Sequence, residues 1–580
     1  MPYARAHAGG TLVDLLVAHD VRFVFGVAGG QTAALYDAIG DGRHEIAHVA
    51  VRDERSAAYA ADAYARTTGA VGVCDATVGP GTAKLPSGLG EAFNSSIPVV
   101  ALVSELPTTT EARRYRGATS QALDQEALLA PVTKWTATVR RIDDLAPIVR
   151  RAFREATTGR PGAVAVICPQ DILDGEPAAI EPDPNARRFA RFPALPVPAA
   201  PADAEGAATI LTRAQRPLLV LGGGARAAGA GAAALRLVDA AGVGVATTLS
   251  GKGCVDERHP LAVGVLGTLG SGSARAAAEE TDLLVLVGTK LGSGASLGWS
   301  LPRPGQRTVQ IDVDPSELGR DHPVDALVMA DARLGLEAIH TALARMDRGA
   351  TANLRAEWRR RLAELGDEWR AARDQERGSS ATPVAPQRVM GVLQVLLETD
   401  DVVVADASLS SGWVGSYIEC TAGGPMTLFP RGLAGLGWAI PAAIGAAVAT
   451  TDRRVVAVMG DGAAAYAVGE LATIGQAGWP VKMVVLNNTS LGWIRWYRRI
   501  NFGRGWDEPD APATDFAALA AAYGIPSQRV ESPDDVGPAL GKAMAADGPA
   551  LVEVVTAVWE TPIASHRAAL AEEAPAAYGA

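Results

Sequence analysis

The sequence predicts an α/β protein made of three consecutive doubly wound parallel-sheet domains. At 580 residues the chain is too long for one hydrophobic core. Short apolar runs, rich in β-branched residues and bounded by Gly or Pro, alternate with helical stretches in three segments. Runs of this kind are typical of strands that are buried on both faces of a parallel sheet. Two breaks in composition separate the three segments, so three domains are expected.

The first domain is expected over residues 1–175. Its predicted strands are FVFGV (23–27), VGVCDAT (71–77), IPVVALVS (97–104) and AVAVICP (163–169). A helix is predicted over residues 56–67, between the first two of these runs. The prolines of residues 176–203 disfavour regular structure, so this segment is expected to be an extended linker.

A central domain is expected over residues 204–345, a helical linker over 346–386 and a third domain over 387–558. The predicted central strands lie in PLLVLGGG, GVGVATTL, TDLLVLVGT and RTVQIDVD. Those of the third domain lie in VVVADA, VVAVMGDG, VKMVVLNN and PALVEVVTA. Residues 559–580 would form a C-terminal tail whose position suits a lid.

Composition limits the classes of function. A net charge of −11 argues against nucleic acid as the main partner. Four cysteines without CxxC spacing exclude a zinc ribbon and indicate a reducing compartment. The sequence shows no signal-peptide core and no apolar run of membrane-spanning length. We therefore expect a cytoplasmic protein without a membrane partner.

Polar residues follow two apolar runs of the third domain. Gly460-Asp461-Gly462 ends one run and Asn487-Asn488 ends the next, with 24 residues between the two groups. Parallel sheets bind ligands at the carboxyl ends of their strands. A carboxylate and an amide oxygen there would suit Mg²⁺, and the glycines and following helix N-terminus would suit a phosphate. GDG alone is more often a turn, but GDG and NN at neighbouring strand ends are far more specific.

This pattern resembles the signature of thiamine diphosphate-dependent enzymes, which holds magnesium and the cofactor diphosphate. Four other segments resemble parts of the same family: residues 24–30, 77–84, 159–171 and 430–446. The resemblance covers almost the whole chain and is closest to the acetolactate synthase branch. It implies that the first domain binds the cofactor pyrimidine and the third binds its diphosphate.

The resemblance also implies the residues of the cofactor site. Asp461, Asn488 and the carbonyl of Ser490 would bind magnesium. Leu436 stands at the position of the family's apolar wedge under the thiazolium ring, and the backbone at Ala434 would meet the aminopyrimidine. The remaining cofactor residues implied are Gly29, Gly30, Pro80, Gly81, Ser410, Ser411, Gly460, Gly462 and Ala463.

Glu54 takes the place of the family's catalytic glutamate, because VRDERSAA resembles RHEQGA. It would hydrogen-bond the pyrimidine ring and so turn the exocyclic amine into a base. Without the other motifs, Glu54 would be interpreted as a solvated charge. Asp53 departs from the family's usual histidine. Family members assemble this site from two subunits, so the resemblance implies at least a homodimer, with a homotetramer expected.

Substrate residues are less clearly marked. Gln121 precedes Lys134 by 13 residues, as in acetolactate synthases, and would face the reacting carbonyl; an exposed loop amide is the alternative. No histidine falls in residues 110–121, which disfavours a simple pyruvate decarboxylase. Gln31 and Lys84 depart from the family pattern, which usually has alanine and asparagine there, and Gln31 is a further candidate for a substrate contact. Further candidates for the substrate pocket, or for simple packing, are Trp493, Ile494 and Tyr497.

We therefore expect a thiamine diphosphate- and Mg²⁺-dependent lyase or carboligase acting on a 2-keto acid. A 2-hydroxyacyl-CoA lyase or oxalyl-CoA decarboxylase-like enzyme, acting on an acyl-CoA, is the alternative, and a non-catalytic relative is less favoured. The central domain could bind FAD, coenzyme A or neither. Its LGGGAR turn (221–226) is weak evidence for a nucleotide, and the RFDDR pattern of FAD-binding members is absent from residues 288–296.

Overall fold

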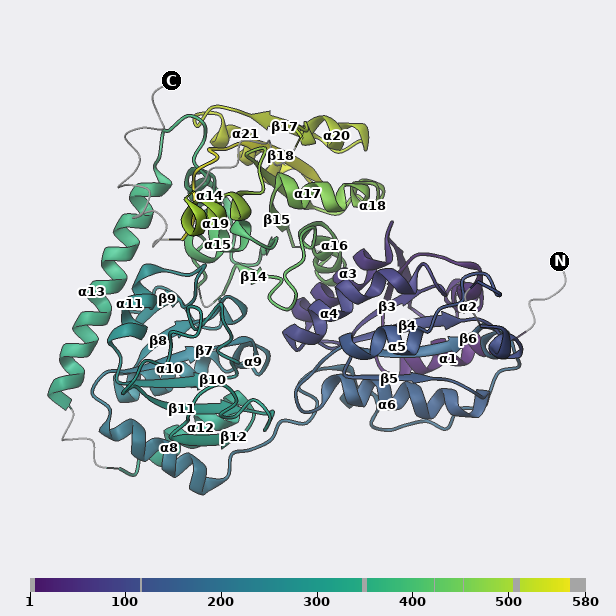
Figure 1. Cartoon of the computed structure of the whole chain (residues 1–580), viewed down its shortest axis with the longest axis horizontal. Helices are drawn as coiled ribbons and strands as arrows, with labels where there is room; N and C mark the ends of the chain where they lie inside the picture. The colour runs from purple at the N-terminus through teal and green to yellow at the C-terminus, as the bar shows by residue number, and fades with distance from the viewer. Residues whose placement is uncertain are drawn as a thin grey trace. The chain divides into compact units, whose positions relative to one another are not determined.

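Three six-stranded sheets, each parallel throughout, form the framework of the chain (Figure 1). The structure is a computed structural model that describes residues 6–114, 117–346, 352–421, 423–451, 453–503 and 512–563. Helices connect most of the successive strands, and the exceptions all lie in the second sheet. The predicted fold class of three α/β parallel-sheet domains is confirmed.

The first sheet has the strand order β2-β1-β3-β4-β6-β5. Its strands are β1 (Phe23–Gly26), β2 (Ala47–Ala50), β3 (Gly72–Ala76), β4 (Val99–Glu105), β5 (Trp135–Thr138) and β6 (Val164–Pro169). The accompanying helices are α1 (Ala8–Ala18), α2 (Ala33–Gly40), α3 (Glu54–Thr68), α4 (Leu85–Ser95), α5 (Gln125–Leu129), α6 (Leu145–Thr157) and α7 (Gln170–Leu173). The strand order reverses between β1 and β3, which is where a doubly wound sheet opens a ligand crevice.

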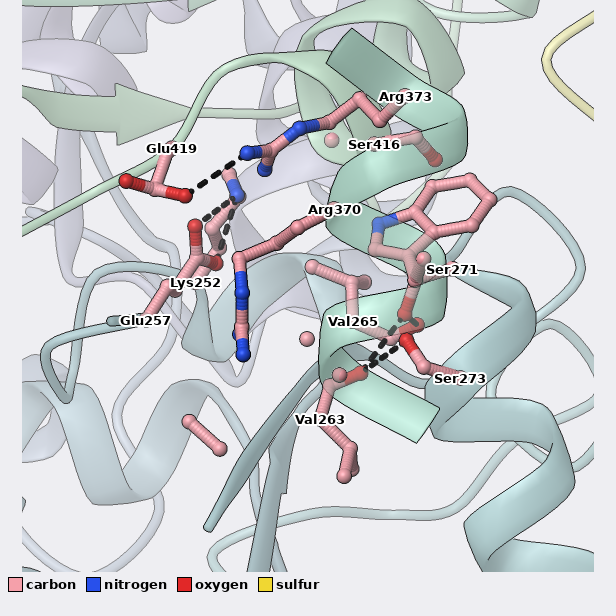
Figure 2. A pocket seen from close by; sticks show the side chains of 15 residues that line it. Lys252, Glu257, Val263, Val265, Ser271, Ser273, Arg370, Arg373, Ser416 and Glu419 are labelled. Carbon is pink, nitrogen blue, oxygen red and sulfur yellow. Dashed lines mark hydrogen bonds and ion pairs between the residues drawn. The ribbon is translucent and has the colours of Figure 1, made fainter. Parts of the chain in front are cut away.

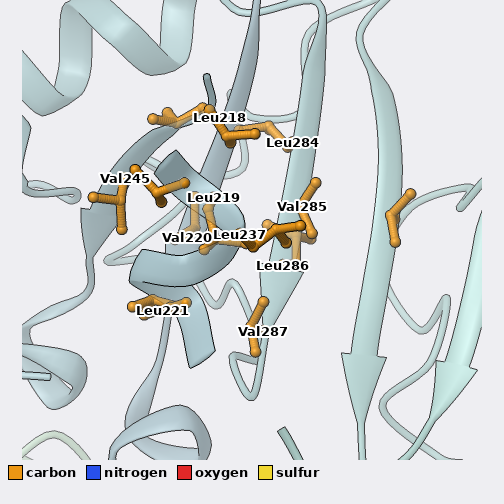
Figure 3. Packing of buried hydrophobic residues seen from close by; sticks show 14 of the residues in the cluster. Leu218, Leu219, Val220, Leu221, Leu237, Val245, Leu284, Val285, Leu286 and Val287 are labelled. Carbon is orange, nitrogen blue, oxygen red and sulfur yellow. The ribbon is translucent and has the colours of Figure 1, made fainter. Parts of the chain in front are cut away.

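The second sheet has the order β12-β11-β10-β7-β8-β9. Its strands are β7 (Pro217–Leu221), β8 (Gly244–Thr247), β9 (Ala262–Val265), β10 (Leu283–Val287), β11 (Arg307–Asp312) and β12 (Ala326–Met329). Its helices are α8 (Pro201–Arg213), α9 (Gly223–Ala227), α10 (Gly231–Ala241), α11 (Gly272–Glu280) and α12 (Ala332–Leu343), followed by the long α13 (Ala352–Arg377). Figure 3 shows Leu219 and Val285, from the central strands β7 and β10, packed in the hydrophobic core of this domain.

The third sheet repeats the topology of the first, with the order β14-β13-β15-β16-β18-β17. Its strands are β13 (Val402–Ala405), β14 (Met426–Leu428), β15 (Val455–Gly460), β16 (Val481–Asn487), β17 (Ser527–Val530) and β18 (Ala550–Val555). The helices are α14 (Pro386–Leu396), α15 (Leu409–Tyr417), α16 (Ala439–Ala449), α17 (Asp461–Ala467), α18 (Leu471–Ala477), α19 (Gly492–Phe502), α20 (Phe516–Ala522) and α21 (Val536–Ala545). The order reverses between β13 and β15.

Contacts divide the chain into two compact units. One contains the described parts of residues 1–195, 430–452 and 467–479, and the other contains the remainder. Within the first unit, the apolar helix α16 packs along α3. The Trp438 indole, just before α16, donates to the buried Asp62 of α3 over 3.2 Å. The segments 430–452 and 467–479 therefore pack with the first sheet, although they follow strands of the third sheet in sequence.

The predicted linker at 176–203 contains little regular structure. A 3-10 turn spans Ala186–Ala190, and the Ala190 carbonyl accepts a hydrogen bond from Val71 N over 2.9 Å. Helix α8 begins at Pro201, where a proline costs no hydrogen bond. Within the part of the chain that the structure describes, no helix is long and apolar enough to cross a membrane. Most of the predicted tail, residues 564–580, lies outside the described residues.

Candidate active site

The loops that follow β1 and β3 meet where the first sheet reverses its strand order. A Cβ atom on Gly29 would lie 2.5 Å from Thr77, so only glycine allows this close approach. Thr77 Oγ1 donates to Gln31 Oε1 over 2.9 Å, and Gln31 Nε2 donates to Gln121 Oε1 over 3.2 Å. The fold therefore brings together Gln31 and Gln121, both predicted to lie at the substrate, in a hydrogen-bonded chain.

Glu54 lies at the same edge of the sheet, as the first residue of α3. Its side chain is 7% exposed, and Oε2 is buried without a hydrogen-bond partner. Lys84 Nζ lies 3.2 Å from this oxygen, at an ion-pair distance but not in hydrogen-bonding geometry. A Cβ atom on Gly81 would lie 2.8 Å from Oε1. A shielded carboxyl oxygen without a hydrogen-bond donor is the chemistry expected of a group that pairs with a ligand.

A buried polar cluster behind this edge was not identified from the sequence. Asp75, in the central strand β3, is fully buried and accepts a hydrogen bond of 2.8 Å from the Tyr36 hydroxyl. His48 Nε2 lies 3.3 Å from its other oxygen. Burial raises the pKa of Asp75, against the opposing effect of His48 and Tyr36. The signal that could have revealed this cluster is the single carboxylate in an otherwise apolar buried strand.

The segment with the predicted ring-contacting residues is held by one buried carboxylate. Glu91 of α4 accepts hydrogen bonds of 2.8 to 2.9 Å from three successive backbone N–H groups, at residues 432–434. Arg66 donates to the same carboxylate over 3.0 Å. Burial acts to raise the pKa of Glu91, but Arg66 and the N–H groups outweigh it and hold that pKa below its usual value. Ala434 adopts the left-handed conformation with φ +54°, and the half-buried Leu436 follows it.

Glu91→Gln is expected to destabilise this segment, because a neutral amide cannot accept from three N–H groups and pair with Arg66. Hydrogen bonds to a charged group contribute roughly 1.5–3 kcal/mol, so we expect a loss of about 2–3 kcal/mol in unfolding free energy. Denaturant unfolding of the purified protein measures this loss. Ser95→Ala is the matched control, since it removes one hydroxyl donor at 2.8 Å and keeps the carboxylate. Equal stability of Glu91→Gln and Ser95→Ala would contradict the assigned role.

The carboxyl ends of β15 and β16 bring the predicted metal ligands together. Asp461 begins α17 directly after β15 and is 4% exposed. Its Oδ2 accepts from the backbone N–H of Ser490 over 3.1 Å, and Asn488 Oδ1 accepts from the same N–H over 3.1 Å. Burial raises the pKa of Asp461 to about 6, against the lowering effect of backbone N–H groups. A carboxylate and an amide oxygen that converge in this way suit a hard cation such as Mg²⁺.

The two consecutive asparagines have different surroundings. Asn487 is 2% exposed and donates to Glu553 Oε1 over 2.7 Å, while its own oxygen accepts from Thr489 N. It therefore stabilises the turn after β16. Asn488 is only half-buried, which leaves it as the ligand candidate. Among the described residues, no group of three or more His, Cys, Asp or Glu side chains is placed to hold a metal, so a cation site here depends on amide and carbonyl oxygens as well.

The other predicted diphosphate residues lie where β13 and β15 lead into the helices that follow them. Ser410 and Ser411 are buried in the first turn of α15, and Ser411 Oγ donates to the Asp406 carbonyl over 2.7 Å. Ser408, the residue before this helix, has φ +66° and ψ −141°, a strained conformation for a residue other than glycine. Gly460, Gly462 and Ala463 follow directly at the end of β15. Strain of this kind is frequent at ligand-binding turns.

Helix α19 carries the residues predicted for the substrate pocket, and these residues differ in exposure. Trp493 packs against the core of the third sheet. Trp496 is 1% exposed, and its indole donates to the Glu560 carbonyl over 3.2 Å. Ile494 and Tyr497 are 42% and 52% exposed. Of the predicted pocket residues on α19, Ile494 and Tyr497 are therefore the ones accessible to a ligand.

The glycine-rich turn of the central domain has a packing explanation. A Cβ atom on Gly222 would lie 2.2 Å from the carbonyl oxygen of Gly288, and one on Gly224 would lie 3.0 Å from the Gly288 Cα. The loops after β7 and β10 thus touch backbone to backbone. The glycines are required by this contact, whether or not a nucleotide binds nearby.

A small pocket lies between β9, α13 and α15 (Figure 2). Lys252 and Glu257 form a buried ion pair of 2.6 Å at one side, and Arg373 pairs with Glu419 over 3.0 Å at another. Arg370 extends beside the Lys252–Glu257 pair. The cavity volume is about 30 Å³, enough for one or two water molecules. In this conformation the pocket is too small for FAD or coenzyme A.

Three family models match the chain in the order of its sheets. Residues 6–128 match "Thiamine pyrophosphate enzyme, N-terminal TPP binding domain", and residues 204–339 match the family's central domain. Residues 406–554 match its C-terminal TPP binding domain. The chain therefore belongs to the thiamine pyrophosphate (thiamine diphosphate) enzyme family, as the resemblance of its motifs predicted.

Two similar relatives belong to one branch of that family. The chain is 31% identical over 558 residues to a probable acetolactate synthase large subunit of Methanocaldococcus jannaschii, covering 94% of this chain and 91% of the relative. It is 32% identical to acetolactate synthase isozyme 2 large subunit of Escherichia coli, covering 94% of each. The predicted acetolactate synthase-like branch is confirmed.

Proposed function

We propose that the chain is a thiamine diphosphate- and Mg²⁺-dependent enzyme that breaks and forms carbon–carbon bonds of a 2-keto acid. One observation carries the proposal. Two sheets of identical topology present complementary groups at the carboxyl ends of their strands: a shielded carboxyl oxygen of Glu54 in one, and converging oxygens of Asp461 and Asn488 in the other. The acetolactate synthase relatives support this class of reaction.

Different residues are proposed to contact different parts of the cofactor. When bound, thiamine diphosphate supplies an electron sink for cleaving or forming the bond beside a carbonyl group. Asp461, Asn488 and the Ser490 carbonyl would bind Mg²⁺. Glu54 would hydrogen-bond the pyrimidine ring and hold the proton there. The remaining proposed contacts are Ser410, Ser411, Gly460, Gly462 and Ala463 at the diphosphate, and Gly29, Gly30, Pro80, Gly81, Ala434 and Leu436 around the rings.

Gln121 is proposed to contact the substrate. Gln31 already donates to the carbonyl oxygen of the Gln121 amide, so the NH₂ group of that amide is directed to other acceptors. The carbonyl and carboxylate oxygens of a 2-keto acid are such acceptors. The exposed Ile494 and Tyr497, with Trp493 beside them, are proposed to limit the size of the second substrate.

Gln121→Ala is expected to lower kcat/KM for the 2-keto acid by roughly ten- to a hundredfold, the loss typical of one hydrogen bond in a transition state. Gln31→Ala should have a smaller effect, because it only orients Gln121. Steady-state kinetics of the two variants measures both values. An effect of Gln31→Ala as large as that of Gln121→Ala would contradict this order of roles.

The acyl-CoA alternatives gain no support from these relatives, and we do not propose them. The family resemblance supports at least a homodimer, with a homotetramer as the expected assembly. The acidic composition supports a protein without a nucleic-acid partner. The few, widely spaced cysteines support a reducing compartment and so a cytoplasmic protein. Light scattering on the purified protein would test the assembly.

The function is tested by assaying the purified protein with thiamine diphosphate and Mg²⁺. Pyruvate, longer 2-keto acids and 2-hydroxyacyl-CoA esters serve as substrates, with carbon dioxide and ligation products as readouts. We expect carbon dioxide release and ligation from a 2-keto acid. Cleavage of the CoA esters alone, or cofactor binding without any turnover, would overturn the proposal.

A further inference from the structure

Two departures from the family motifs, 31 residues apart in sequence, meet at Glu54. Asp53 stands where the family usually has histidine, and Lys84 stands where it has asparagine. In the structure, Lys84 Nζ lies 3.2 Å from Asp53 Oδ2 and 3.2 Å from Glu54 Oε2. One ammonium group therefore bridges two neighbouring carboxylates, one of which is the proposed catalytic group.

The three side chains differ in their freedom to move. Glu54 is 7% exposed, whereas the Lys84 side chain is 47% exposed. The Lys84 backbone is fixed by a short 3-10 turn, Thr82–Lys84, in which its N–H donates to the Gly81 carbonyl over 3.1 Å. Asp53 is anchored as well, because its Oδ1 accepts from Arg55 N over 2.9 Å and caps α3. The ammonium at the end of the flexible Lys84 stem is thus the mobile part of the group.

We propose that Lys84 competes with the cofactor for Glu54, and that Asp53 receives the ammonium when Glu54 is engaged by the pyrimidine ring. The inference rests on the proposed function, because it assigns Glu54 to the cofactor. An ammonium paired with Glu54 stabilises the carboxylate in the cofactor-free chain, so cofactor binding must give up that contact. Asp53 Oδ2 is already within 3.2 Å, and its contact with Lys84 persists after Glu54 is released.

The two partners of Lys84 should therefore have opposite effects on cofactor affinity. Lys84→Met keeps the length of the side chain and removes the charge, so we expect the Kd for thiamine diphosphate to fall. Asp53→Asn keeps an oxygen to cap α3 but removes the alternative partner of Lys84, so we expect the Kd to rise. Each change should be about three- to fivefold, the range of a partly exposed ion pair. In the Lys84→Met background, Asp53→Asn should have no further effect.

Isothermal titration of the full-length protein with thiamine diphosphate, at saturating Mg²⁺, measures these constants without turnover. Lys84→Arg is the matched control and should stay close to the wild type, because it retains the cation. Thermal unfolding without cofactor confirms that each variant is folded. Weaker cofactor binding by Lys84→Met would overturn the inference. So would a rise in Kd caused by Asp53→Asn that is as large in the Lys84→Met protein as in the wild type. Failure of the wild-type protein to bind the cofactor would instead overturn the proposed function.

Discussion

Glu54→Gln is expected to reduce turnover of the 2-keto acid by about 10²- to 10⁴-fold, the range for loss of a general acid–base group. Glutamine has nearly the same shape as glutamate and can still hydrogen-bond, but its amide cannot pass a proton to or from the pyrimidine ring. The shielded position of Glu54, 7% exposed, prevents bulk water from taking over this role. The measurement is kcat at saturating thiamine diphosphate and Mg²⁺.

A second carboxylate provides the control for this substitution. Glu205 is exposed on α8 of the central domain, and Glu205→Gln should leave kcat unchanged. Thermal unfolding should show that Glu54→Gln is folded, since the substitution conserves volume. If Glu54→Gln turned over substrate at the wild-type rate, Glu54 would not be the proton-holding group and the catalytic assignment would be wrong.

Four strands in each sheet could be predicted from the sequence, and the two missed strands lie at the edges in all three sheets. The missed strands are β2 and β5, β9 and β12, and β14 and β17. The central strands are buried on both faces and form continuous apolar runs, such as the fully buried Leu283–Val287. Edge strands have one partner, and several are partly exposed, so sequences such as Ser527–Val530 lack that signal. The edge strands β9 and β14 are mostly buried but span only four and three residues.

The candidate site was predictable where its residues lie in contiguous motifs. Asp461 and Asn488 directly follow strands, and parallel strands end at one edge, so their convergence follows from the sequence pattern. The Gln31–Gln121 hydrogen bond and the Lys84 bridge join residues from different loops. Their formation depends on loop conformation and side-chain reach, which no local pattern encodes. The sequence identified Lys84 only as an unexplained departure.

Asp461→Asn is expected to remove most of the Mg²⁺-dependent cofactor affinity, with a Kd for thiamine diphosphate raised by about a hundredfold or more. Mg²⁺ prefers charged oxygen ligands, and replacing the carboxylate leaves only neutral oxygens among the proposed protein ligands. The measurement is titration with thiamine diphosphate at fixed Mg²⁺. Thr489→Ala is the matched control, because this exposed side chain lies in the same loop and donates only to the Asn488 carbonyl.

The same substitution should stabilise the metal-free protein at neutral pH. Burial raises the pKa of Asp461 from 3.8 to about 6, so ionisation of the carboxyl disfavours the folded state. This penalty is absent below pH 4, develops between pH 4 and 6, and is complete above pH 6. The rise in the pKa corresponds to a loss of at most roughly 3 kcal/mol in the unfolding free energy of the wild type. Because the substitution also alters the hydrogen bonds of the side chain, we expect the variant to gain about 1–2 kcal/mol. Thermal unfolding with a chelator should therefore show Asp461→Asn melting above the wild type at pH 8 and losing that advantage at pH 4. Lower stability of Asp461→Asn at pH 8 would show that the backbone N–H groups already compensate the buried charge.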